Sequence, residues 1–153
     1  MRSKYGFETT GERSKLMTKI KSENTKPEIK LRKALFKNGV RFRIKNKELY
    51  GNPDIAIRKY KLIIFIDGEF WHGFNWEIKK LRIATNKSYW IPKIEKNMER
   101  DRSVNLHYEN IGWTVVRLWD KQINSNLEGC IQNIMAYLTK AKNNLRSKPN
   151  GQR

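Results

Sequence analysis

Carboxylates and an imidazole follow two short apolar segments near the middle of the chain. Asp54 follows Asn52-Pro53 and precedes Ile55-Ala56-Ile57, while the apolar run Leu62–Ile66 leads into Asp67-Gly68-Glu69-Phe70-Trp71-His72. Residues that follow a buried strand emerge at one edge of a sheet, where carboxylates are costly unless they are paired or bind a cation. A neutral imidazole suits proton abstraction from water. The pattern therefore predicts a metal-dependent hydrolytic site, although Asp after Pro is also common in turns and a lone His is more often structural.

Two further acids lie within reach of this site in principle. In the expected helix of residues 88–110, Asp101 shares a face with Ile94, Asn97, Met98 and Val104 and interrupts a mostly apolar stripe. Asp101 is either a partner in a buried ion pair or a carboxylate that holds an imidazole in one tautomer. Glu28 is explained by helix capping, and its spacing leaves open whether it also reaches the site.

The overall charge points to a polyanionic substrate. The 153 residues carry a formal net charge of +18, and about half of it lies outside the segments 1–26 and 140–153. Clustered Lys and Arg neutralise phosphates, so nucleic acid is the favoured partner. A basic structural protein of the ribosomal type would carry a similar charge and is the alternative. No apolar run reaches the roughly 18 residues of a membrane span. The single cysteine, Cys130, excludes an intramolecular disulfide and a multi-cysteine zinc site.

The expected elements alternate between helix and strand. Thr25-Lys26-Pro27-Glu28 predicts a capped helix start, and Asn38-Gly39 its end. Residues 40–44, 54–57 and 62–66 predict strands, with a turn at 58–61 between the last two. A helix over 88–110 with Pro92 in its first turn, a strand over 113–119 and a helix over 127–138 follow, after a variable segment at 73–87. We expect an α/β sandwich with a small mixed sheet between helices.

The length indicates one domain with a real core. We expect residues 1–12 to be a flexible arm, residues 13–139 the folded domain and residues 140–153 a frayed basic tail. Met1 to Thr10 lacks the apolar core of a signal peptide, so a cytoplasmic protein is expected.

As a set, six segments resemble the very-short-patch repair (Vsr) endonuclease family, within the wider PD-(D/E)XK nuclease fold. The resemblance runs from about Arg13 to Trp119 in the order of the family. The segments are Arg13-Ser14-Lys15-Leu16-Met17, Asn24-Thr25-Lys26-Pro27-Glu28, Gly51-Asn52-Pro53-Asp54, Ile64 to Gly73, Lys96-Asn97-Met98-Glu99-Arg100-Asp101 and Gly112 to Val116.

The resemblance implies a restriction-endonuclease-like three-layer sandwich and a Mg²⁺-dependent nick in duplex DNA 5′ to the thymine of a T:G mismatch. It implies that Asp54 and the main-chain carbonyl of Ile66 bind the metal and that Glu28 binds metal-coordinated waters. By the same resemblance, His72 activates water and Asp101 orients His72. The residues implied to contact or open the DNA are Met17, Phe70, Trp71 and Asn97.

The chain departs from the family pattern in two places. Well-known members hold a structural zinc near the Phe-Trp-His segment and after the last strand, whereas the matching positions here are Glu69, Gly73 to Trp76 and Lys121. We therefore expect no structural zinc, and we expect packing of Phe74 and Trp76 to close that loop instead. The usual D/E-x-K of the broader fold is also absent, which leaves Asp67 and Glu69 as acids of open role.

The sequence thus predicts a DNA endonuclease that nicks at T:G mismatches. A Vsr-like catalytic domain of a homing or site-specific endonuclease and a non-catalytic DNA-binding domain are the alternatives. We expect a monomer in a bacterial or phage setting, associated with the nucleoid, with double-stranded DNA as partner, contact with mismatch-repair proteins and no membrane.

Overall fold

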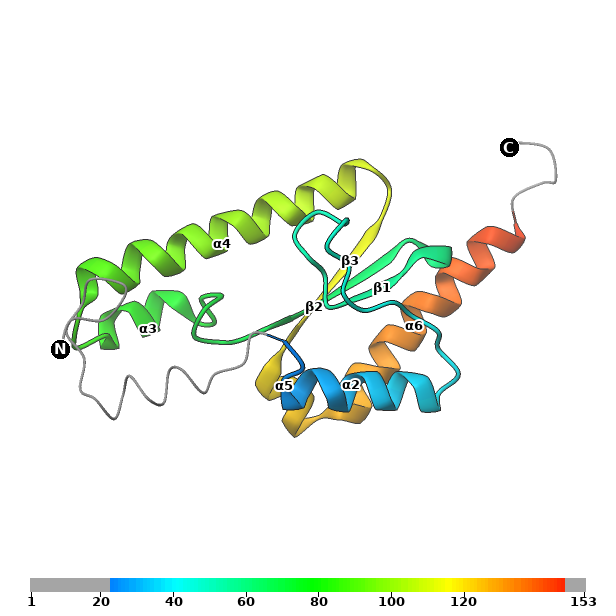
Figure 1. The fold of residues 1–153 in the computed structure, drawn as a ribbon, viewed down its shortest axis with the longest axis horizontal. Helices are drawn as coiled ribbons and strands as arrows, with labels where there is room; N and C mark the ends of the chain where they lie inside the picture. Colours follow the sequence, from blue (N-terminus) through cyan, green and yellow to red (C-terminus); the bar gives the residue numbers. More distant parts are fainter. Residues whose placement is uncertain (1–22, 148–153) are drawn as a thin grey trace.

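The computed structural model describes residues 23–147, which form a three-stranded mixed sheet with helices on both faces (Figure 1). The strands are β1 (Ile55–Ile57), β2 (Leu62–Asp67) and β3 (Thr114–Trp119), with β2 in the centre. β1 runs antiparallel to β2, with Ile55 opposite Ile64, and β3 runs parallel to β2, with Asp67 opposite Trp119. A 3-10 turn, η1 (Arg58–Tyr60), closes the β1–β2 hairpin, as the sequence predicts.

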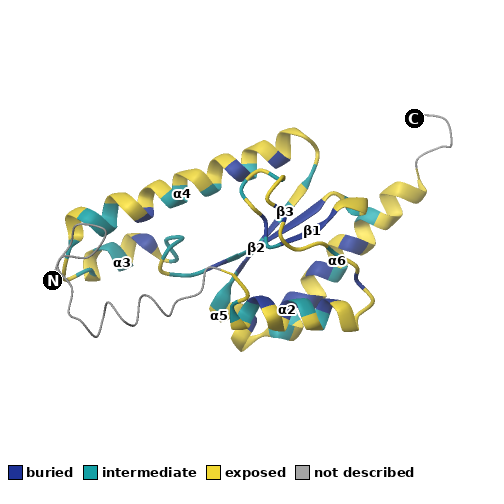
Figure 2. Cartoon of the chain, viewed as in Figure 1, coloured by how far each residue is buried: buried dark blue, intermediate teal, exposed yellow. Residues whose placement is uncertain are grey.

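The two faces of the sheet are covered by different helices. One face packs on α2 (Lys26–Lys37), α5 (Asp120–Ser125) and α6 (Leu127–Arg146), and this core includes the fully buried Leu31, Ile64 and Ile134. The other face packs on α4 (Lys87–Asn110) through Val104 and Tyr108, which contact Ile63 and Phe65. Figure 2 shows the strands buried between these layers. The three-layer α/β sandwich expected from the sequence is confirmed.

The first helix begins as the sequence predicts. The Oγ1 atom of Thr25 caps the backbone N–H of Glu28 at 3.5 Å, and Pro27 lies in the first turn, where its missing N–H costs nothing. In return, the Glu28 carboxylate accepts a hydrogen bond of 3.0 Å from the backbone N–H of Asn24, one residue before the cap. This reciprocal bonding fixes the Glu28 side chain as well as the helix start.

The strand expected at residues 40–44 does not form. Only Arg43 pairs with β1: its N–H donates to the Ala56 carbonyl and its carbonyl accepts from the Ala56 N–H, both at 2.9 Å. The chain then turns away, because Lys45 has a left-handed backbone (φ 59°) and the Asn46 amide binds the Arg43 carbonyl at 3.0 Å. Ile44 remains 40% exposed, so the chain loses no buried apolar contact of this residue when it leaves the sheet.

Other differences lie in and between the helices. The short helix α3 (Trp76–Arg82) forms within the segment expected to vary, and α5 follows β3 directly. Each buries a single residue, Trp76 or Ile123, which is too few to give a periodic apolar pattern. Helix α4 begins at Lys87, so Pro92 lies in its second turn.

The last helix, α6, is longer than its apolar pattern suggests. It continues to Arg146, beyond the expected end near Leu138 and into the segment expected to be a frayed tail. The sequence has no Gly or Pro between Leu138 and Pro149, so nothing in this stretch stops the helix. Within residues 23–147, no helix is long and apolar enough to cross a membrane.

Candidate active site

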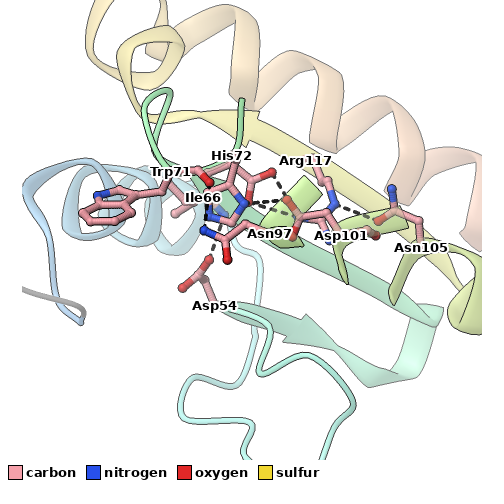
Figure 3. Close-up of polar contacts among 9 residues, drawn as sticks. Asp54, Ile66, Trp71, His72, Asn97, Asp101, Asn105 and Arg117 are labelled. Carbon is pink, nitrogen blue, oxygen red and sulfur yellow. Dashed lines mark hydrogen bonds and ion pairs between the residues drawn. The ribbon is translucent and has the colours of Figure 1, made fainter. Parts of the chain in front are cut away.

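Asp54 sits at the start of β1 and points to the end of β2. Its Oδ2 atom accepts a hydrogen bond of 2.7 Å from the backbone N–H of Ile66 (Figure 3). Burial raises the pKa of Asp54 to about 6, and the negative charges of Glu28 and Asp67 add to this, while the Ile66 N–H and Arg32 oppose it. A carboxylate desolvated beside other acids gains from a nearby cation, which is the chemistry expected of a metal ligand.

A buried asparagine holds the turn that presents Asp54. Asn46 is 3% exposed, and its Nδ2 atom donates to the carbonyls of Arg43 at 3.0 Å and Pro53 at 3.2 Å. Asn52 adopts a left-handed backbone (φ 51°) just before Pro53, and asparagine tolerates this conformation better than most residues. These contacts fix the direction in which Asp54 leaves the turn.

The backbone of β2 explains why Ile66 belongs to the site although its side chain carries no chemistry. In an extended strand the N–H and C=O of one residue point to the same edge. The N–H of Ile66 points to Asp54, so its carbonyl faces the same edge of the sheet. The register of β1 ends with Ile55 opposite Ile64, so β1 has no residue opposite Ile66.

Glu28 approaches Asp54 from α2. Both acids line one pocket of about 260 Å³, together with Arg32, Lys45, Asn46 and Asn52, among others. Glu28 is 5% exposed, and its Oε2 atom receives bonds from Arg32 Nη2 at 2.8 Å and from the Asn24 N–H. Capping therefore explains the helix start, and the same side chain also borders the candidate site.

His72 follows β2 and is held by Asp101 of α4. The His72 Nδ1 atom lies 2.6 Å from Asp101 Oδ2. An ionised carboxylate can only accept, so this contact places the proton of a neutral imidazole on Nδ1 and leaves Nε2 as a proton acceptor. Burial lowers the pKa of His72, but the Asp101 hydrogen bond and the charges of Asp67 and Asp101 outweigh burial and raise it. The pair expected from the sequence is therefore brought together across 29 residues of chain.

The loop between β2 and α3 is pressed against α4. The Asn97 Nδ2 atom donates to the Trp71 carbonyl at 3.1 Å, one residue before His72. Gly73 has φ +73°, and a Cβ atom there would collide with the Met98 side chain. Only glycine suits both conditions. Asn97 and Gly73 thus fix the loop on either side of His72.

Asp67 is buried in an ion pair with Arg117 of β3. Arg117 Nη1 lies 3.1 Å and 3.0 Å from the two oxygens of Asp67 and 3.5 Å from Asp101 Oδ1. Ligand atoms of Asp67, His72 and Asp101 all lie within 4.8 Å of one another, a spacing that a cation could bridge. The Arg117 guanidinium already supplies the positive charge there, so Asp54, which has no such ion pair among the described residues, is the better candidate metal ligand.

An aromatic cluster borders His72. Phe70 is 44% exposed, and its ring centroid lies 5.2 Å from that of Trp71 and 5.1 Å from that of Trp90 in the first turn of α4. Trp71 and Trp90 are 5.5 Å apart, all three pairs in edge-to-face geometry. A surface of this kind can stack on or wedge between bases.

Comparison with known proteins identifies the family of the chain. A family model described as DNA mismatch endonuclease Vsr matches residues 7–78. The type II nicking enzyme V.HpaIIP of Haemophilus parainfluenzae is 46% identical over 121 residues, covering 78% of this chain and 86% of that protein.

The chain belongs to the Vsr family of DNA endonucleases. V.NmeDIP of Neisseria meningitidis, also a type II nicking enzyme, is 40% identical over 82% of this chain and 85% of its own length. The DNA mismatch endonuclease Vsr of Escherichia coli is 36% identical over 71% of this chain and 69% of its own length. Membership in the Vsr family makes the chain a DNA-cleaving hydrolase, as the sequence resemblance implies.

The positions where well-known Vsr members carry zinc ligands hold other contacts here. Glu69 Oε2 lies 3.4 Å from Lys79 Nζ and 3.1 Å from Lys121 Nζ, so it ties the loop to α3 and α5. The Phe74 ring packs on Trp119 at 5.0 Å, and Trp76 is buried. Packing and ion pairs therefore close the loop, and the lack of a structural zinc stays a prediction.

Among the residues described, most of the predicted Vsr site lies at one end of the sheet. Met17 lies outside the described residues, and His107 lies away from the site, exposed and packed on Tyr50 at 4.8 Å. Sequence reasoning missed Asn46, Trp90 and Arg117. Arg117 gave one signal that could have been read, because it is the single charged residue within the strand Thr114–Trp119.

Proposed function

We propose that this protein nicks duplex DNA at T:G mismatches in very-short-patch repair, with a divalent cation, Mg²⁺, bound by Asp54. The observation that carries the proposal is the arrangement of Asp54 at the Ile66 backbone beside the His72–Asp101 pair. The names of the relatives support the two parts of the activity. V.HpaIIP is called a nicking enzyme, and the E. coli relative is called a DNA mismatch endonuclease.

The donor set fits a hard cation. Asp54 and the Ile66 carbonyl would hold it, and Glu28, in the same pocket, would bind its waters. A bound Mg²⁺ would polarise the phosphodiester and stabilise the charge that develops on its oxygens. Asp54 and Glu28 together carry two negative charges, and the Arg32 ion pair with Glu28 offsets one of them. A bound cation would offset the other.

His72 supplies the proton acceptor. Its Nε2 atom takes a proton from the attacking water, while Asp101 accepts from Nδ1–H and stabilises the imidazolium that forms. Attack of the water oxygen on phosphorus forms one P–O bond, and the bond to the 3′ oxygen of the preceding nucleotide breaks. The departing 3′ oxygen takes a proton from solvent, so the products are a 5′ phosphate on the thymidine and a free 3′ hydroxyl.

The aromatic cluster supplies access to the mismatch. Phe70 is partly exposed, packs on Trp71 and Trp90, and lies two residues before His72 in the chain. Unpairing costs least at a mismatched step, so a wedge there favours mismatched over paired DNA. The net charge of +18 holds the phosphate backbone without regard to sequence.

The test is a nicking assay on matched duplexes that differ only at one base pair: T:G, other mismatches, and fully paired DNA, each with Mg²⁺ or with a chelator. We expect a single nick on the thymine strand of the T:G duplex with Mg²⁺. His72→Gln should abolish it, whereas His107→Gln, which changes the exposed histidine, should not. Cutting of a long, fully paired site would instead identify a site-specific endonuclease. Salt-dependent binding without any cutting would identify a non-catalytic DNA-binding domain.

A further inference from the structure

Arg117 engages all three of its guanidinium nitrogens on one side of the candidate site. Nη1 binds both oxygens of Asp67, Nε donates to Asn105 Oδ1 at 2.7 Å, and Nη2 lies 3.5 Å from the Asp101 carbonyl. The guanidinium also lies 4.3 Å from the centroid of the Phe65 ring, its register partner on β2. The planar fork of Arg suits such multiple contacts, which a Lys could not reproduce. Arg117 therefore links β2, β3 and α4 at the level of His72.

Two carboxylates compete for the same nitrogen of His72. Asp101 Oδ2 lies 2.6 Å from Nδ1, and Asp67 Oδ1 lies 3.7 Å from it. The charged side chains that the described structure places around His72 are Asp67 from β2, Asp101 from α4 and Arg117 from β3. The net charge of Asp67, Asp101 and Arg117 together is −1, and removal of Arg117 would make it −2.

The Asp67 carboxylate is the more buried of the two acids. Its side chain is 6% exposed, against 21% for Asp101, and Arg117 is 19% exposed. A buried carboxylate that loses its partner is strongly disfavoured and recruits the nearest available positive charge or proton. The nearest titratable nitrogen is His72 Nδ1.

We propose that Arg117 is a positioning residue that neutralises Asp67 and steadies Asp101, so that Asp101 alone acts on Nδ1 of His72. The catalytic part of this inference, that His72 acts as the base, rests on the proposed function. The part that concerns the charges around His72 rests on the geometry alone. It also explains why Asp67, the most conspicuous acid of the β2 segment, is paired rather than free to bind a cation. Loss of Arg117 should leave His72 holding a proton that it must lack to act as a base.

The test compares Arg117→Gln, Asp67→Asn/Arg117→Gln and Arg117→Lys with the unaltered protein. Long-range ¹H–¹⁵N NMR of the two histidine rings reports their charge and tautomer without DNA or metal. In Arg117→Gln we expect the titration midpoint of the His72 ring to move to higher pH. Over part of the pH range the ring should then be charged, although it is neutral in the unaltered protein. The double variant removes the unpaired carboxylate and should return the midpoint towards the unaltered value. The exposed His107 is an internal control and should not move.

Single-turnover nicking of the T:G duplex gives the second readout. Arg117→Gln should lower the rate about tenfold to a hundredfold, the range typical of groups that orient a functional side chain, with little change in DNA affinity. The double variant should recover most of that loss, because the two substitutions are coupled through one contact. Arg117→Lys keeps the positive charge but not the forked contacts, so its His72 midpoint should lie closer to the unaltered value than that of Arg117→Gln. Circular dichroism should confirm that each variant folds.

Equal losses in the single and double variants would overturn the proposal, because a merely structural Arg117 would not be rescued by removing Asp67. An unchanged His72 spectrum in folded Arg117→Gln would overturn it as well. If no variant and no unaltered protein nicks DNA while the NMR coupling appears, the proposed function fails and the charge balance around His72 stands.

Discussion

Asp54 and Ile66 meet through a 2.7 Å hydrogen bond from the Ile66 N–H to the Asp54 carboxylate, although twelve residues separate them in the chain. The bond crosses from the start of β1 to the end of β2, just past the last paired residues of the hairpin. It places a carboxylate and the exposed backbone edge of β2 at one point. The metal site that we propose depends on this hydrogen bond between the Ile66 N–H and the Asp54 carboxylate.

Replacing Asp54 by Asn should change how stability depends on pH. The folded pKa is about 6 and the ordinary value is 3.8, so between these values the folded protein binds more protons than the unfolded chain. Folding stability from this group therefore falls as pH rises from about 4 to about 6 and stays lower above that. In urea unfolding without metal, the loss of unfolding free energy between about pH 4 and pH 6.5 should be smaller for Asp54→Asn than for the unaltered protein. A loss equal to that of the unaltered protein would contradict the shift.

A divalent cation should offset this cost at neutral pH. Any ligand that binds only the folded state stabilises it by mass action, by about 2.7 kcal/mol at a hundredfold excess over its Kd. Mg²⁺ should raise the melting temperature of the unaltered protein, and a chelator should reverse the rise. Asp54→Asn should lose most of it, whereas Glu109→Gln, an exposed carboxylate late on α4, should keep it. An equal rise in both variants would place the cation elsewhere.

The nicking rate should rise with pH through the titration of His72. The proton acceptor must be neutral, and the pKa of His72 is raised above 6.5 despite burial, chiefly by Asp101. At saturating Mg²⁺ the rate should therefore climb through a midpoint above 6.5 and then level off. Asp101→Asn removes a charge that raises this pKa, so its midpoint should fall and its plateau should be lower. A midpoint unchanged by Asp101→Asn would separate the two residues functionally.

Asn46 should contribute both to stability and to the nicking rate, although its side chain is not one of the proposed catalytic groups. Asn46→Ala leaves the buried carbonyl of Pro53 without this donor, while the Arg43 carbonyl keeps its bond from the Ala56 N–H. An unsatisfied buried acceptor costs about 1–3 kcal/mol in unfolding free energy. It should also lower the nicking rate, because Asp54 follows Pro53 directly. Asn38→Ala is the matched control, since Asn38 also donates to a backbone carbonyl, that of Ala34, but from an exposed position. Similar effects of the two substitutions would remove the role given to the buried turn.

The Phe70 ring should contribute to DNA binding and little to folding. It is 44% exposed, and base–aromatic stacking is worth about 1–3 kcal/mol per base. Phe70→Ala should weaken binding to a T:G duplex about fivefold to a hundredfold in fluorescence anisotropy. The control is Leu81→Ala on α3, which removes a more exposed apolar side chain at 77%. Equal binding by Phe70→Ala and the unaltered protein would place the wedge at another residue.

The sequence by itself determined the elements with strong local signals. The Thr25 cap, the apolar run Leu62–Ile66 and the helix of residues 88–110 all form as predicted, because capping and burial act over a few residues. The motif segments also identified the family, since they occur in one order along the chain. Residues 40–44 have the right alternation for a strand, but a left-handed Lys45 and the Asn46 side chain end the pairing after one bridge.

Only the tertiary structure decided the partners of the acids. The sequence left the role of Asp67 open, and it left Asp101 as either an ion-pair partner or the carboxylate that holds an imidazole; both acids lie beside His72. The parallel register of β2 and β3 places Arg117 between them, which turns Asp67 into a paired carboxylate and leaves Asp101 to hold His72. Sequence spacing cannot give this answer, because a charge is satisfied by whatever lies nearest in space, and 50 residues of chain separate Asp67 from Arg117.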